Sequence, residues 1–169
     1  MKNILVLTDY SDVANNAVRY ALAIIKNTEA KYVFFHAGNQ SELKLRENIN
    51  SLFPIEETLQ NNSKYITSPL NYNLETIKEL IRHYKIDFIF MGTIGDKKPI
   101  FSKIFGSNTA VTIEGVDIPV IAVPPEYTYK QIKKIAFASD INLSKEPPST
   151  TVKEIKHIKL PIIIFRKEL

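Results

Sequence analysis

Residues 2–11 read KNILVLTDYS, a short apolar run that ends on polar residues. Ile4–Leu7 is apolar at four consecutive positions, which is typical of a strand buried on both faces. Residues 14–25 then carry apolar side chains at three- and four-residue spacing, the pattern of an amphipathic helix. A buried strand followed directly by a helix is the expected opening of a parallel sheet with helical crossovers.

The same alternation continues along the chain. Further strands are predicted at 31–36, 64–67, 88–91 and 118–123, and further helices at 41–53, 73–84 and 106–115. Ser41 and Asn73 are the predicted N-caps of two of these helices. The pattern predicts an α/β fold, a doubly wound five-stranded parallel sheet with helices on both faces. Such sheets bind ligands at the carboxyl ends of their strands, which directs attention to loops 8–11 and 92–107.

The composition of the chain excludes several classes of protein. The chain has 169 residues, 44% apolar and 24% charged, and no cysteine. This length suits one domain, or one domain with an appendage. The absence of cysteine excludes disulfides, thiolate metal sites and cysteine nucleophiles. No apolar run approaches the ~18 residues of a membrane span, and the N-terminal apolar run is too short for a signal peptide. We therefore expect a soluble, cytoplasmic protein with no membrane partner.

The positive charge is confined to the C-terminal part. Residues 1–129 hold 13 basic and 14 acidic side chains, whereas residues 130–169 hold nine basic and four acidic ones. A solvated helix face explains Lys153, Lys156 and Lys159 more simply than a nucleic-acid surface does. We expect no nucleic-acid partner.

The C-terminal forty residues resemble the ends of the preceding domain. Residues 133–142 match residues 2–11 at an offset of 131, and Ser149–Phe165 matches Ser107–Val123 at an offset of 42. One interpretation is that 128–169 is a truncated second copy of a domain at 1–127, which retains the first strand, last helix and last strand and extends the sheet edge. Chance similarity between generic strands is the other interpretation.

Three of the five glycines gather in one loop. Gly92, Gly95 and Gly106 follow the 88–91 strand, and Ser107 and Asn108 come directly after the third. Glycine lets the backbone approach a phosphate closely, and a helix start supplies N–H donors and a positive dipole end. Turns and helix caps use the same residues without any ligand, so the spacing alone leaves both explanations open.

Residues 1–125 resemble the universal stress protein family. The similarity is carried by residues 4–11, 35–37, 91–95, 106–110 and 118–120. The resemblance implies the five-stranded, Rossmann-like fold just described, dimeric or tandem. It also implies a nucleotide site made of Thr8, Asp9, Ala37, Met91, Gly92, Gly95, Gly106, Ser107 and Asn108.

The resemblance also implies a role for each part of this site. The glycines and Ser107 would hold phosphates, Asn108 would add a donor, and Thr8 and Asp9 would lie near the ribose and phosphates. Ala37 would meet adenine through its backbone, and Met91 would line the base pocket. The chain departs from the family pattern because ten residues, not nine, separate Gly95 from Gly106.

The function implied is an adenine-nucleotide-binding regulatory module of the stress response. It would bind ATP or another adenine nucleotide, with Mg²⁺ or Mn²⁺ held through the phosphates. A homodimer through the sheet edge or the tail is expected, with Leu160–Phe165 paired to Ile118–Val123 within one chain or between two. A non-nucleotide-binding interaction protein of the same fold is the first alternative.

A slow nucleotide hydrolase is the second alternative, and it ranks lower. The sequence positions no general base or attacking nucleophile, so we name no catalytic residue and expect no enzyme, although weak ATPase activity stays open. The three histidines lack metal-ligand spacing, so no metal-ligating residue is predicted. We expect His36 to be a hydrogen-bonded residue at a strand end.

Overall fold

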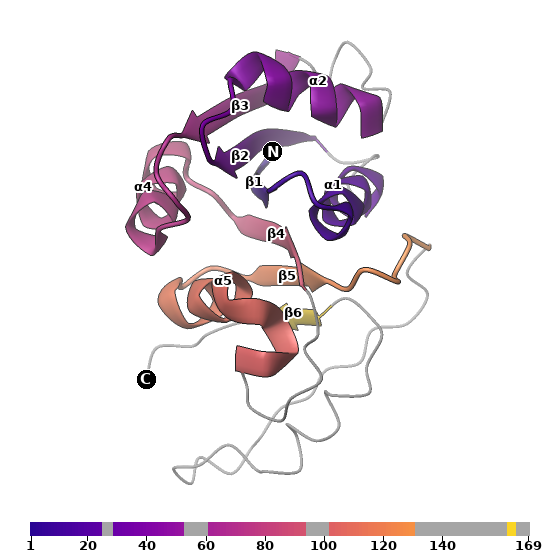
Figure 1. The fold of residues 1–169 in the computed structure, drawn as a ribbon, viewed down its shortest axis with the longest axis vertical. Helices are drawn as coiled ribbons and strands as arrows, with labels where there is room; N and C mark the ends of the chain where they lie inside the picture. The colour runs from indigo at the N-terminus through magenta and orange to yellow at the C-terminus, as the bar shows by residue number, and fades with distance from the viewer. Residues whose placement is uncertain (25–28, 53–60, 94–101, 131–161, 165–169) are drawn as a thin grey trace, which may run out of the picture.

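The computed structural model describes residues 1–24, 29–52, 61–93, 102–130 and 162–164, and within them residues 102–107 and 162–164 by their backbone alone. Strands and helices alternate as the sequence predicts (Figure 1). In chain order they are β1 (Lys2–Leu7), α1 (Asp12–Ile24), β2 (Ala30–Ala37), α2 (Glu42–Leu52), β3 (Ser63–Ser68), α4 (Leu74–Tyr84), β4 (Phe88–Gly92), α5 (Ser102–Gly115), β5 (Val120–Val123) and β6 (Ile162–Ile164).

The strands form one sheet in the order β3-β2-β1-β4-β5-β6. The first five are parallel, which confirms the predicted five-stranded parallel sheet. β1 lies at the centre, with β2 on one side and β4 on the other, so the strand order reverses there. A parallel sheet of this kind binds ligands beyond the carboxyl ends of the strands at that reversal.

Helices cover both faces of the sheet (Figure 1). α1 and α2 pack on one face, where their apolar side chains meet alternate residues of the strands, such as Val6 and Phe34. α4 and α5 pack on the other face, against the intervening strand residues, such as Leu5 and Val33. Because successive strand residues point to opposite faces, two apolar clusters form from one continuous apolar run in each central strand.

Two predicted helix caps are confirmed. The Asn73 side chain accepts a hydrogen bond from Glu75 N at 2.9 Å and begins α4. Ser41 Oγ accepts from Lys44 N at 3.2 Å and begins α2. Each cap satisfies an N–H that has no partner inside its own helix.

The predicted start of the last helix before β5 is wrong. α5 begins at Ser102, four residues before Gly106, and it ends at Gly115 as predicted. The N–H groups at the helix start therefore belong to residues 102–105. Gly106 suggested a later start, because glycine often lies at helix ends. A single glycine inside a helix costs only about 1 kcal/mol relative to alanine, however, and other interactions of a helix can offset that cost.

β6 extends the sheet beyond β5 and runs antiparallel to it. Val120 pairs with Ile164, Ile121 with Ile163 and Ala122 with Ile162. The predicted pairing of the tail strand with the last strand of the domain is therefore confirmed, and it forms within one chain. The rest of the proposed second copy, including residues 135–138, lies outside the described residues, so the repeat stays a prediction. Within the described residues, no helix is long and apolar enough to cross a membrane.

Candidate functional site

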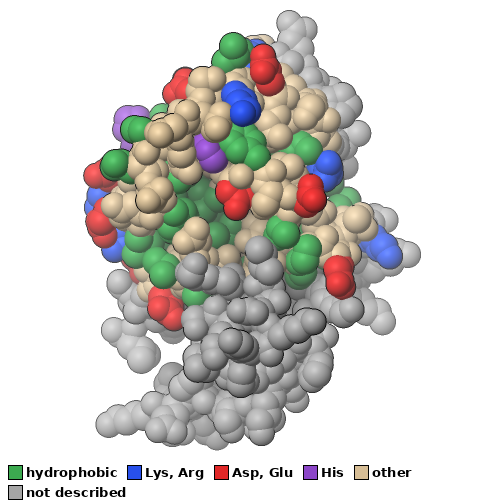
Figure 2. All heavy atoms as spheres, viewed as in Figure 1, with side chains coloured by type: hydrophobic (Ala, Val, Ile, Leu, Met, Phe, Trp, Pro, Cys, Tyr) green, Lys and Arg blue, Asp and Glu red, His purple; other side chains and the backbone are tan. Residues whose placement is uncertain are grey.

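A cavity of about 320 Å³ opens at the carboxyl ends of β1, β2 and β4. This is the end of the sheet at which the strand order reverses around β1. In the space-filling view, hydrophobic side chains gather in a hollow on this face, with polar atoms around its rim (Figure 2). The cavity is lined by Leu7, Thr8, Asp9, Ser11, Val13, Ala14, Phe35, Ala37, Tyr72, Met91, Gly92, Asn108 and Thr109.

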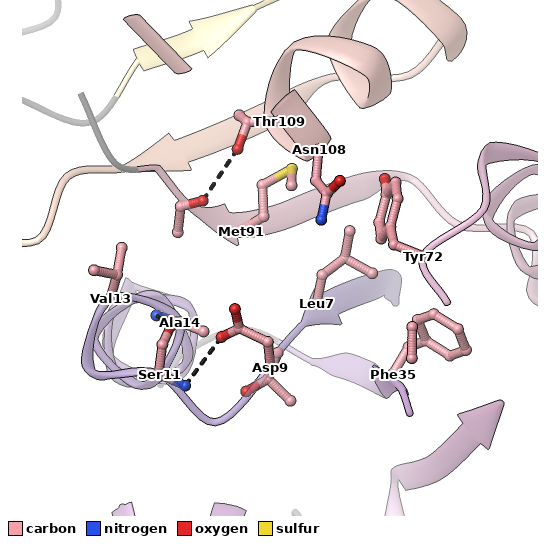
Figure 3. A pocket seen from close by; sticks show the side chains of 13 residues that line it. Leu7, Asp9, Ser11, Val13, Ala14, Phe35, Tyr72, Met91, Asn108 and Thr109 are labelled. Carbon is pink, nitrogen blue, oxygen red and sulfur yellow. Dashed lines mark hydrogen bonds between the residues drawn. The ribbon is translucent and has the colours of Figure 1, made fainter. Parts of the chain in front are cut away.

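The lining residues divide the cavity into an aromatic end and a helix end (Figure 3). Phe35 and Tyr72 lie at the aromatic end, and Ser11, Val13 and Ala14 mark the start of α1 at the helix end. The side chains of Leu7, Asp9, Met91 and Asn108 lie between the two ends. One end therefore offers flat apolar surface, and the other offers the polar groups of a helix N-terminus.

The turn from β1 into α1 is fixed by local hydrogen bonds. Thr8 Oγ1 accepts from Tyr10 N at 3.1 Å, and Asp9 Oδ1 accepts from Ser11 N at 3.0 Å. Ser11 Oγ in turn accepts from Ala14 N at 3.2 Å as the cap of α1. Tyr10 adopts a positive φ of 65°, which is uncommon for a residue other than glycine. This network orients the exposed Asp9 carboxylate at the cavity and uses one of its oxygens.

Ala37 brings backbone hydrogen-bonding groups to the cavity. In a parallel ladder, successive residues direct their N–H and C=O groups to opposite neighbouring strands. Gly38 N donates to Ser68 O on the β3 side, whereas Phe35 O accepts from Thr8 N on the β1 side. The N–H and C=O of Ala37 therefore point to the β1 side as well, just beyond the last β1 residue, Leu7. A donor and an acceptor thus stand side by side at the cavity wall.

His36 joins two strand ends that line the cavity. His36 is 6% exposed, and its Nδ1 donates to the Thr8 carbonyl oxygen at 3.0 Å. The Tyr10 ring packs on it, with the two ring centroids 4.3 Å apart. The prediction of a hydrogen-bonded strand-end histidine is confirmed, and the bond ties the end of β2 to the β1–α1 turn.

Gly92 is required by packing at the end of β4. A Cβ atom added there would stand 2.7 Å from the Val13 carbonyl oxygen, a backbone atom that cannot move aside easily. The Gly92 carbonyl accepts from Thr109 Oγ1 at 3.2 Å, which connects β4 to α5 (Figure 3). Packing of α1 and α5 against the end of β4 therefore requires a glycine at this position, independently of any ligand.

The structure brings most of the predicted site residues to this one cavity. Those that line it are Thr8, Asp9, Ala37, Met91, Gly92 and Asn108. Gly95 lies outside the described residues. Gly106 and Ser107 lie in the backbone of α5, and the structure describes no side chain for Ser107.

Sequence reasoning missed the aromatic end of the cavity. Phe35 is the first residue of the short resemblance at 35–37, but Tyr72, which lies at the same end of the cavity, comes from the segment between β3 and α4. That segment holds no glycine, and it is not one of the two loops, 8–11 and 92–107, that the sequence singled out. An aromatic residue directly before the Asn73 cap was the available signal, and only the fold shows that this position reaches the cavity.

The cavity lining carries few ionisable side chains. Asp9 is the one carboxylate among the described lining residues, and those residues include no lysine, arginine or histidine. Burial raises the pKa of the Tyr72 hydroxyl above its usual value, so this group stays protonated at neutral pH. No cluster of three or more metal-ligating side chains occurs in the described part of the chain.

Solved structures with the same fold include universal stress proteins. The hypothetical protein MJ0577, whose biochemical function was assigned from its structure, is 23% identical, with a TM-score of 0.53 over 73% of this chain and 95% of that one. A universal stress protein in complex with cAMP is 20% identical, with a TM-score of 0.51 over 72% and 96%. A universal stress protein from Archaeoglobus fulgidus is 18% identical, with a TM-score of 0.50 over 72% and 98%.

No protein-family model and no curated protein matches the chain. The likeness to solved structures, at these identities, establishes the fold. The chain therefore has the α/β fold of universal stress proteins, with β6 added at the β5 edge. The strand order β3-β2-β1-β4-β5 agrees with the doubly wound, five-stranded fold that the resemblance in residues 1–125 implied.

Proposed function

We propose that this chain is an adenine-nucleotide-binding regulatory module that acts in the stress response. The observation that carries the proposal is the cavity at the strand reversal, which joins an apolar slot, a free backbone donor–acceptor pair and a carboxylate. A ligand pocket of this kind is mostly apolar with a few placed polar groups. The complex of a protein of the same fold with cAMP supports an adenine nucleotide as the ligand class.

Each part of the cavity suits one part of such a ligand. The N–H and C=O of Ala37 match the acceptor and donor on the edge of an adenine ring, which would also contact Leu7 and Met91. The second oxygen of the Asp9 carboxylate, which does not bond to Ser11 N, would accept a hydrogen bond from a ribose hydroxyl. The Asn108 amide, which points into the cavity, would donate to the sugar or a phosphate (Figure 3).

Phosphates would extend toward the loop that joins β4 to α5. Gly95, Gly106 and Ser107 are proposed there on the resemblance alone. Among the described lining residues, Asp9 is the one carboxylate that could reach a divalent ion, so Mg²⁺ or Mn²⁺ would be held mainly through the phosphates. We propose binding rather than catalysis, because the described cavity pairs no general base with a nucleophile.

Titration calorimetry with adenosine, AMP, cAMP and ATP, with and without Mg²⁺, tests the proposal. Asp9→Asn should weaken adenosine binding by about ten- to a hundred-fold, since it removes a hydrogen bond to a charged acceptor. Asp12→Asn is the matched control, because Asp12 is an exposed neighbouring acid that does not line the cavity. Ser107→Ala should weaken ATP but not adenosine.

Three results would contradict the proposal or one of its parts. If the wild-type chain binds none of the four compounds, the interaction-protein alternative replaces nucleotide binding. If Asp9→Asn and Asp12→Asn reduce binding equally, the effect comes from net charge and the proposed contact of Asp9 with the ribose is wrong. Release of ADP from ATP, lost in Asp9→Asn, would favour the hydrolase alternative.

A further inference from the structure

Tyr72 stands at the aromatic end of the cavity (Figure 3). It comes from the segment between β3 and α4, whereas Phe35, the other residue of that end, comes from β2. In Figure 3 its side chain stands across the cavity from Phe35, with the side chain of Leu7 between them in the view. Its ring therefore forms a wall that the strands do not supply.

The Tyr72 hydroxyl is fully engaged away from the cavity. Thr112 is completely buried, and its Oγ1 donates to the Asn108 carbonyl oxygen at 2.6 Å, which uses its single proton. Thr112 Oγ1 must then accept, and Tyr72 must donate, in the hydrogen bond between these two hydroxyls. The polar end of the side chain is thus directed onto α5, and its ring is left to face the cavity.

The two residues that follow Tyr72 are also held in place. Asn73, the next residue, caps α4. Leu74 packs so closely on α5 that a Cβ atom added at Gly115 would stand 2.2 Å from its Cδ2. Thr112 and Gly115 are three residues apart and so lie on one face of α5. The segment 72–74 is therefore clamped onto α5, with the Tyr72 ring held at one place.

From this geometry we infer that Tyr72 is a specificity-determining residue: its ring stacks on the flat ring of the ligand, and its bond to Thr112 holds that ring at a fixed position relative to Asn108. The inference rests on the proposed nucleotide function and deepens it. It requires a planar heteroaromatic ligand, because an aromatic face held in place rewards stacking and gives little to a flexible chain. The same segment could instead serve only to attach α4 to α5.

Variants at both ends of the hydrogen bond separate the two roles. Tyr72→Leu removes the ring and should weaken adenosine binding by about 5- to 150-fold, the range for one base stacked on one aromatic side chain. Tyr72→Phe keeps the ring and should lose less. Thr112→Val removes the other partner of the same bond, so it should match Tyr72→Phe, and the double variant should be no worse than either alone.

Titration calorimetry with adenosine, together with thermal unfolding of the ligand-free variants, gives the readouts. A purely structural role would lower the unfolding temperature of Tyr72→Leu and leave the adenosine affinity of the folded variant equal to that of Tyr72→Phe. Tyr72→Met, which fills the space with a flexible apolar side chain, replaces Tyr72→Leu if that variant does not fold.

Three outcomes decide. A large loss for Tyr72→Leu with a small one for Tyr72→Phe supports the stacking role. Equal affinities of Tyr72→Leu and wild type, or equal losses in Tyr72→Leu and Tyr72→Phe, overturn it while the nucleotide function stands. Failure of the wild-type chain to bind adenosine or any adenine nucleotide overturns the proposed function, and the stacking role falls with it.

Discussion

The two edges of the described sheet are built differently. β3, at one edge, has the sequence SKYITS, and its side chains are half-buried or exposed. β5, near the other edge, has the sequence VIAV, and all four residues are at most 3% exposed. β6 pairs with β5 within the chain, whereas β3 pairs with β2 alone among the strands that the structure describes.

This difference shows how one sheet can carry an apolar strand so near its end. An exposed edge presents unpaired N–H and C=O groups, and an apolar edge also invites association with another chain. β3 limits that risk by its polar composition and by Lys64. β5 has no charged residue, so it depends on a partner strand, and the chain supplies one itself.

The largest effect is expected from removing the partner strand. Deletion of residues 160–169 would expose β5, and the protein should then dimerise through that strand or aggregate. Light scattering combined with size-exclusion chromatography measures the change. Deletion of residues 165–169, which leaves β6 intact, is the matched control and should behave as the full chain does. A shorter chain that stays monomeric, soluble and equally stable to heat would show that β6 does not protect β5.

Most of the fold was predictable from the sequence, because its strongest signals are local. Ile4–Leu7 is apolar at every position, a pattern typical of a strand that is buried between helices on both faces. Asn73 and Ser41 gave correct helix starts because a cap depends on one side chain and the next turn. The start of α5 was missed, since a glycine followed by Ser107 and Asn108 resembles a helix start, whereas here Gly106 lies inside the helix.

The candidate site was predictable in part. Thr8, Asp9 and Gly92 end strands whose order fixes where they meet, so their convergence followed from the fold. Tyr72 could not be placed, because its position depends on how the β3–α4 segment docks onto α5. The packing role of Gly92 against Val13 was also invisible, since it depends on the approach of α1 to β4.

A smaller effect is expected where the chain leaves β5. Asn16 of α1 donates through Nδ2 to the carbonyl oxygens of Pro124 and Tyr127, at 3.0 and 2.8 Å. Asn16→Ala leaves both carbonyls without this donor and should lower the free energy of unfolding by about 1–3 kcal/mol. Urea denaturation measures it. Arg19→Ala, an exposed change on the same helix, should stay within about 0.5 kcal/mol. Equal losses in the two variants would show that the two hydrogen bonds of Asn16 contribute nothing to stability.

The smallest effect is expected at the polar edge. Lys64→Ile would make β3 more like β5 without a partner strand, so association at high protein concentration should rise while the unfolding temperature changes little. Lys31→Ile is the matched control, because Lys31 is an exposed lysine in β2, whose backbone is paired on both sides by β1 and β3. Static light scattering over a concentration series compares the two. If both variants associate to the same extent, added apolar surface is the cause, and the unpaired backbone of the β3 edge has no part in it.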